Sequence, residues 1–286
     1  MLLAIAVAFA FASCSADVLA DNIARVAGGL SGTGINVFTG SRGSAQSSSG
    51  SAEKSVDFVL ESYGSQAKQE RFNAAEEQIQ EAVNQMRAGS TSDTVHNIEA
   101  IKPLIVQLLD SITLDGEVMD SLLFDISKAS VNESSKDALR KKLANVEIAE
   151  GSPAYEIYYS AMNIVKELLE MMNNGRASAS PYALWLDNGS AKAEMDFSPV
   201  FEEVAPPTIA DVVVMSIMSE AMRNLLDFTQ MSDIKISDAA GLIYGAVDVL
   251  IVADTLGGED ESEYRGFVGI VQIMMDKLKV KGVLGL

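Results

Sequence analysis

Apolar residues recur every three or four positions along most of the chain after residue 53. This is the period of an α-helix with one buried face. Such stripes span residues 72–86, 98–112, 118–126, 139–146 and 157–172, and the last of these is the clearest. Pro103 predicts a kink or a helix start within the second stripe. Ser152 and Pro153 mark the start of the last one, because serine caps helices and proline suits the first helical position.

The segment 175–207 interrupts the helical period, and four of the six prolines fall within it. Its centre, 187–190, reads Asp-Asn-Gly-Ser between two short alternating segments. Asn-Gly in that setting is the strongest local signal for a β-hairpin. We therefore expect one small hairpin near residues 183–197, inserted among helices.

Helices resume after the prolines. Thr208 and Asp211 have the spacing of a capping box. The helix that they predict, about 209–229, is apolar on nearly every side, which means that it is buried or faces something apolar. Two more helices follow, one starting at Ser237 and one around Phe267. The predicted fold is mainly α, with about eight to ten helices in one multi-helix array or bundle and one hairpin.

The N-terminus has a different character. Residues 1–12 are all apolar, too few to span a bilayer, which needs about 20. Ser13 follows, and then Cys14, the only cysteine in the chain. An apolar run that closes on small residues has the form of a secretory signal, and a cysteine at the break point resembles a bacterial lipoprotein signal with a relaxed, spirochaete-like lipobox. The alternative is an apolar N-terminal helix with a buried cysteine.

This pattern predicts three regions. Residues 1–13 are a signal peptide, and 14–52 carry the lipidated Cys14, a short helix and a linker rich in Gly and Ser at 39–52. Residues 53–286 are the helical domain. No Lys or Arg precedes the apolar run, although signal peptides usually begin with positive charge, which leaves open whether Met1 is the true start.

Residues 22–41 resemble the N-terminal segment of TatT-type lipoproteins, the periplasmic T component associated with some spirochaete TRAP transporters. The resemblance is carried by a short helix, a Gly/Ser turn and a Val-Phe-Thr stretch, here Gly32, Gly34, Val37, Phe38 and Thr39, and continues around 59–63. It implies an all-helical periplasmic lipoprotein, held at the inner or outer membrane.

Charge and residue types exclude several function classes. The net charge is −19, so no basic face is expected for nucleic acid, and membrane contact must come from acyl chains or apolar surface. His96 is the only histidine, which excludes a zinc site and leaves a catalytic triad dependent on that residue. We expect a capping or surface histidine, no enzyme activity, no metal and no cofactor.

Carboxylates offer two further readings. Asp254 and the acidic run 259–263 could bind calcium through oxygen atoms, or could simply favour a following helix N-terminus. Two carboxylates could also pair for hydrolysis, although no spacing singles out such a pair.

Methionine gives the only positive hint of a binding site. Ten of the thirteen methionines lie after residue 160, and methionine is common both in cores and at adaptable apolar binding surfaces. A hypothetical ligand-binding face comprises Trp185, Val213, Met215, Met218, Met222, Met274 and Met275. We expect an exported lipoprotein of the cell envelope that binds an apolar ligand or a partner protein, for example as an accessory to solute uptake. The alternative is a structural or envelope-interaction protein without a small-molecule site.

Overall fold

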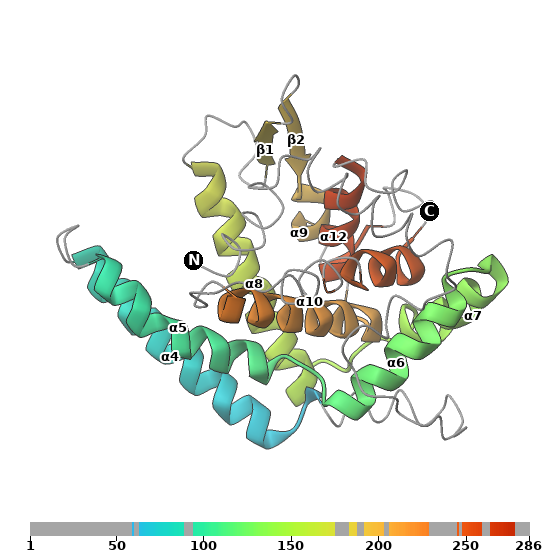
Figure 1. Ribbon diagram of the computed structural model, residues 1–286, viewed down its shortest axis with the longest axis horizontal. Helices are drawn as coiled ribbons and strands as arrows, with labels where there is room; N and C mark the ends of the chain where they lie inside the picture. The colour runs from blue at the N-terminus through green and yellow to red at the C-terminus, as the bar shows by residue number, and fades with distance from the viewer. Residues whose placement is uncertain are drawn as a thin grey trace.

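The computed structural model describes residues 59, 63–88, 94–174, 183–187, 192–202, 206–228, 245, 248–258 and 264–277, and these are mainly helical (Figure 1). The predicted signal peptide, Cys14 and the predicted linker lie outside them. The elements are α4 Gln66–Ala88, α5 Thr94–Ser111, α6 Gly116–Ala129, α7 Glu133–Leu143, α8 Pro153–Asn174, β1 Ala183–Asp187, β2 Lys192–Asp196, α9 Ser198–Glu202, α10 Ile209–Phe228 and α12 Gly266–Lys277, with a further helical stretch at 248–256. The mainly α prediction is confirmed.

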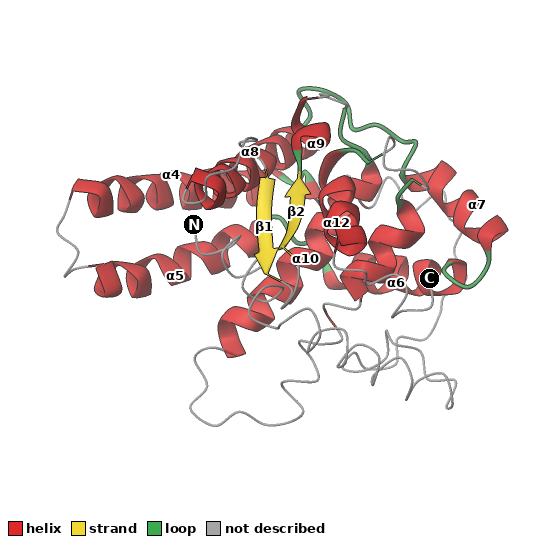
Figure 2. Ribbon diagram, turned by 90° about the horizontal axis from the view of Figure 1, so that it is seen from above, coloured by secondary structure: helices red, strands yellow, loops and turns green. Residues whose placement is uncertain are grey.

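Helices α4 and α5 run side by side and extend beyond the other described helices (Figure 2). Phe72 and Ala75 of α4 are fully buried, as is Leu109 of α5, so the predicted apolar stripes form the contact between the two helices and the core. Pro103 lies inside α5, which begins at Thr94. Of the two outcomes predicted for Pro103, a helix start is therefore wrong.

Polar contacts connect this helix pair to the rest of the molecule. Lys68 of α4, only 5% exposed, donates to the carbonyl of Thr113 at 2.6 Å and pairs with Asp115 at 3.2 Å. One residue along, the backbone N–H of Leu114 donates to the buried hydroxyl of Ser216 in α10 at 2.6 Å. The turn between α5 and α6 is thus held from two sides.

Helix α8 begins as the sequence predicts. Pro153 is its first residue, and the Ser152 hydroxyl accepts a hydrogen bond from the backbone N–H of Tyr155 at 3.2 Å. The buried positions Ala154, Ile157 and Ala161 then follow at helical spacing.

The predicted hairpin is present. Strands β1 and β2 pair antiparallel, with Ala183 opposite Asp196 and Asp187 opposite Lys192. The turn at 188–191, with the Asn-Gly signal, lies outside the described residues. Met195 and Phe197 are buried, and β2 packs against α12, so the end of the hairpin belongs to the core.

Helix α10 lies at the centre of the fold, against α5, α7 and α12 (Figure 1). Every residue from Ile209 to Ser219 is buried, which confirms that a helix apolar on nearly every side is enclosed. Its two buried serines are satisfied: Ser216 accepts from Leu114, and Ser219 donates to the Met215 carbonyl at 2.7 Å. No helix among the described residues is long and apolar enough to cross a bilayer.

Candidate functional site

The start of α10 is built on the predicted capping box. The Asp211 carboxylate accepts hydrogen bonds from both the backbone N–H and the hydroxyl of Thr208, each at 2.9 Å. In return, the Thr208 hydroxyl accepts from the backbone N–H of Asp211 at 3.4 Å. The reciprocal pair satisfies donors that a helix start leaves without partners.

Asp211 has a second partner that the local pattern does not reveal. Its other carboxylate oxygen accepts from the backbone N–H of Val268, in the first turn of α12, at 3.1 Å. Gly266 makes this approach feasible, because it has a φ of 57° and a Cβ there would overlap the carboxylate. One buried side chain therefore joins the beginnings of α10 and α12.

Tyr158 of α8 adds a third helix to this junction. Its hydroxyl accepts from the backbone N–H of Phe267 at 3.1 Å. Burial, and then the nearby Asp211 charge, raise the pKa of Tyr158 well above its ordinary value. Burial also raises the pKa of Asp211, against the opposing effect of its hydrogen bonds to Thr208, Val268 and Phe267.

The residues of the hypothetical ligand-binding face lie further along two of the helices that meet at this junction. Six of its seven residues lie on α10 and α12, in one contiguous core, with exposures of 0–7%. They are Val213, Met215, Met218, Met222, Met274 and Met275. Because all six are interior, any ligand that they bind must itself be enclosed by the protein.

The structure gives further information on two residues of this face, Met215 and Trp185. Met215 accepts a hydrogen bond at its sulfur from the hydroxyl of Tyr63, at 3.4 Å, and burial raises the pKa of that tyrosine. Met215 thus has a structural role besides filling the core. Trp185 lies on β1 opposite Glu194, and its side chain is outside the described part of the structure.

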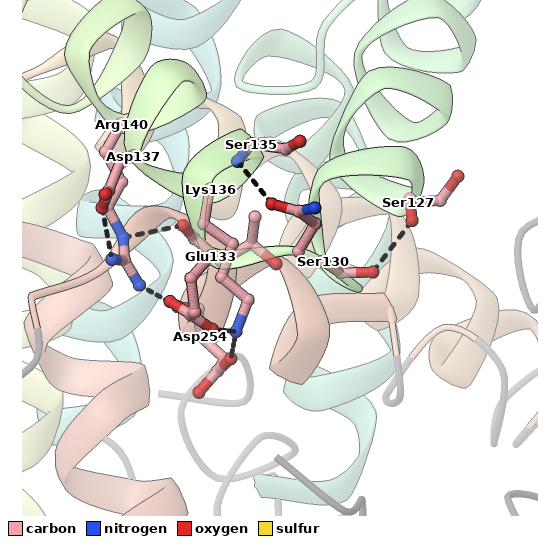
Figure 3. Close-up of polar contacts among 10 residues, drawn as sticks. Ser127, Ser130, Glu133, Ser135, Lys136, Asp137, Arg140 and Asp254 are labelled. Carbon is pink, nitrogen blue, oxygen red and sulfur yellow. Dashed lines mark hydrogen bonds and ion pairs between the residues drawn. The ribbon is translucent and has the colours of Figure 1, made fainter.

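One residue of the acidic stretch considered for calcium, Asp254, has an ion-pair partner in the structure. Asp254 pairs with Lys136 of α7 at 3.0 Å, and Lys136 also pairs with Glu133 at 3.1 Å (Figure 3). Arg140 donates to the backbone carbonyls of Thr255 and Asp254 at 3.0 and 3.3 Å. Two cations of α7 therefore meet the end of the helical stretch 248–256, where cations are favourable. Asp254 serves this contact, and residues 259–263 lie outside the described part.

Other candidate residues give little chemistry. The described residues contain no group of three His, Cys, Asp or Glu side chains that could hold a metal ion. His96 lies on α5, but its side chain is not among those described, and Cys14 is outside the described part altogether.

The sequence analysis did not single out an aromatic pair on α8, Tyr155 and Tyr159. The rings of Tyr155 and Tyr159 are nearly parallel, with centroids 5.9 Å apart, and Tyr159 is 46% exposed. The available signal was their spacing of four residues, outside the apolar stripe of the helix.

Comparisons with known proteins add no assignment. No protein-family model matches the chain, and neither the curated proteins nor the solved structures contain a significant match.

Proposed function

We propose that this chain is an exported lipoprotein, anchored through Cys14, whose helical domain binds a partner protein in the cell envelope without catalysing a reaction. The observation that carries the anchor is the unbroken apolar run of 1–12 followed by Ser13 and the only cysteine. An accessory role in solute uptake is one form that such a partnership takes.

The choice of a protein partner rests on where the apolar and polar groups lie. The methionines that suggested a ligand face are interior, whereas the large side chain of Tyr159 is exposed at the surface. The buried titratable groups Asp211 and Tyr158 are engaged with helix N-termini. This arrangement supports binding over catalysis.

Intact mass measurement of the protein from its native host tests the anchor. We expect a chain that begins at Cys14 and carries the added mass of acyl groups. A Cys14→Ser variant is the matched control, because it keeps the apolar run but removes the thiol to be acylated, and it should remain unacylated. Recovery of uncleaved chain with a free thiol at Cys14 would refute the proposal.

An enclosed apolar ligand between α10 and α12 is a second candidate, favoured by the six residues that these helices bring into one core. Protein extracted gently from native membranes should then release a co-purifying lipid detectable by mass spectrometry. Met218→Ala, which opens space at a 7% exposed position, should change saturable binding of a hydrophobic dye, whereas Met162→Ala, at a half-buried position on α8, should not. Unchanged dye binding in a folded Met218→Ala variant rules this site out.

A further inference from the structure

The first turns of α8 carry one inward-facing tyrosine and, beside it on the helix surface, a more exposed tyrosine pair. Tyr158 faces inward, where its hydroxyl accepts from the backbone of Phe267. Tyr155 and Tyr159 form a nearly parallel pair on another face, with an angle of 6° between the rings. Tyr159 is 46% exposed and Tyr155 is half-buried. The inward tyrosine has a structural partner, whereas the outward pair presents ring surface to solvent.

The other large exposed apolar side chains differ from this pair. Phe124 of α6 is 41% exposed, but the ammonium of Lys128 already lies 3.8 Å from its ring centroid. Val131 is 85% exposed in the turn between α6 and α7 and has no ring. Within the described residues, the α8 pair is therefore the exposed aromatic surface without a cation of its own chain against it.

The charge around the pair is negative. Burial, followed by the charges of Glu150, Tyr159 and Glu156, raises the pKa of Tyr155. Glu150 and Glu156 are both exposed, and neither forms an ion pair within the part of the chain that the structure describes. Aromatic faces and carboxylates both attract cations, and an arginine guanidinium can stack on a tyrosine while donating to a carboxylate.

We propose that Tyr155, Tyr159, Glu150 and Glu156 form a docking surface for an arginine side chain presented by a partner protein. This surface deepens the proposed function and rests on it, since it supplies the contact for the partner. An anionic lipid surface is a poor occupant, because the two carboxylates and the net charge of −19 repel it.

The probe for this surface is a dye-labelled peptide of alternating glycine and arginine, titrated into the full chain purified in uncharged detergent and followed by fluorescence anisotropy. The reference peptide has citrulline, a neutral isostere, at every arginine. We expect tighter binding of the arginine peptide and about fivefold weaker binding after Tyr159→Ala or Glu156→Gln, the change that corresponds to about 1 kcal/mol. Tyr159→Phe, which keeps the ring, should retain binding.

Two matched variants separate this surface from general attraction to an acidic protein. Phe124→Ala removes an aromatic ring of similar exposure, and Glu117→Gln removes an exposed negative charge on α6. Neither should weaken binding, and circular dichroism should show all variants folded. Equal binding of the citrulline peptide, equal losses in the control variants or no saturable binding each overturn the inference. Acylation at Cys14 is measured independently, so failure here leaves the anchor proposal standing.

Discussion

Replacing Asp211 with alanine removes a carboxylate that bonds to the beginnings of both α10 and α12. The N–H and hydroxyl of Thr208 lose their acceptor, and so does the buried N–H of Val268. Asp211 is itself only 4% exposed, so water cannot readily replace it at these donors.

The size of the effect follows from these contacts. Loss of an N-terminal cap costs about 1 kcal/mol, and a buried donor left without a partner costs about 1–3 kcal/mol. Removing a carboxylate whose burial raises its pKa offsets part of this loss. We therefore expect Asp211→Ala to lower the free energy of unfolding by about 1–3 kcal/mol.

Urea unfolding followed by circular dichroism measures this change. Asp137→Ala is the matched control, because Asp137 is a 60% exposed carboxylate on α7 whose loss should alter stability by about 0.5 kcal/mol or less. If both variants unfold at the same urea concentration, Asp211 does not hold the two helices as described.

The Asp211→Asn variant tests whether the negative charge of Asp211 stabilises or destabilises the folded protein. The pKa of Asp211 is raised in the folded protein, so the folded state takes up the proton at higher pH than the unfolded chain, whose aspartate pKa is about 3.9. As pH falls from neutral through the folded-state pKa to below about 3.9, the wild type should therefore gain stability relative to Asp211→Asn. A relative loss on acidification would show that hydrogen bonds to the charged carboxylate outweigh its burial.

Two further substitutions probe neighbouring contacts. Gly266→Ala places a methyl group against Asp211 at a positive φ and should cost about 2 kcal/mol or more, measured by urea unfolding; a neutral effect would contradict the close approach. Lys136→Ala leaves Asp254, 14% exposed, without its lysine and should cost about 1–2 kcal/mol by thermal unfolding, whereas the exposed Lys141→Ala on the same helix should cost little; equal effects would argue against the α7 contact.

Much of the secondary structure could be predicted because its signals are local. The Ser152-Pro153 start of α8 and the Thr208–Asp211 capping box involve residues within one turn of each other, and both are confirmed. The period of the apolar stripes likewise records which face of each helix is buried. The outcome at Pro103 was not determined in this way, since both a kink and a helix start satisfy the local restraint of proline.

The candidate site could not be predicted from local sequence signals alone. Methionine enrichment located a set of residues on α10 and α12, but composition does not distinguish a core from a binding face, and the fold places the six helical members in the interior. The spacing of Tyr155 and Tyr159 was visible, but their exposure and stacking depend on which side of α8 meets the core.

The sequence by itself determined most of the described helices, the hairpin and the capping box, because each depends on residues a few positions apart whose spacing repeats the geometry of the element. It did not indicate the short helix α9, Ser198–Glu202, which lies within the proline-rich segment where only a hairpin was expected. Only the tertiary structure decided that Asp211 reaches Val268, that Tyr63 donates to Met215 and that Lys136 meets Asp254. These pairs lie far apart along the chain, and their contacts arise when packing of the apolar faces brings the helices together.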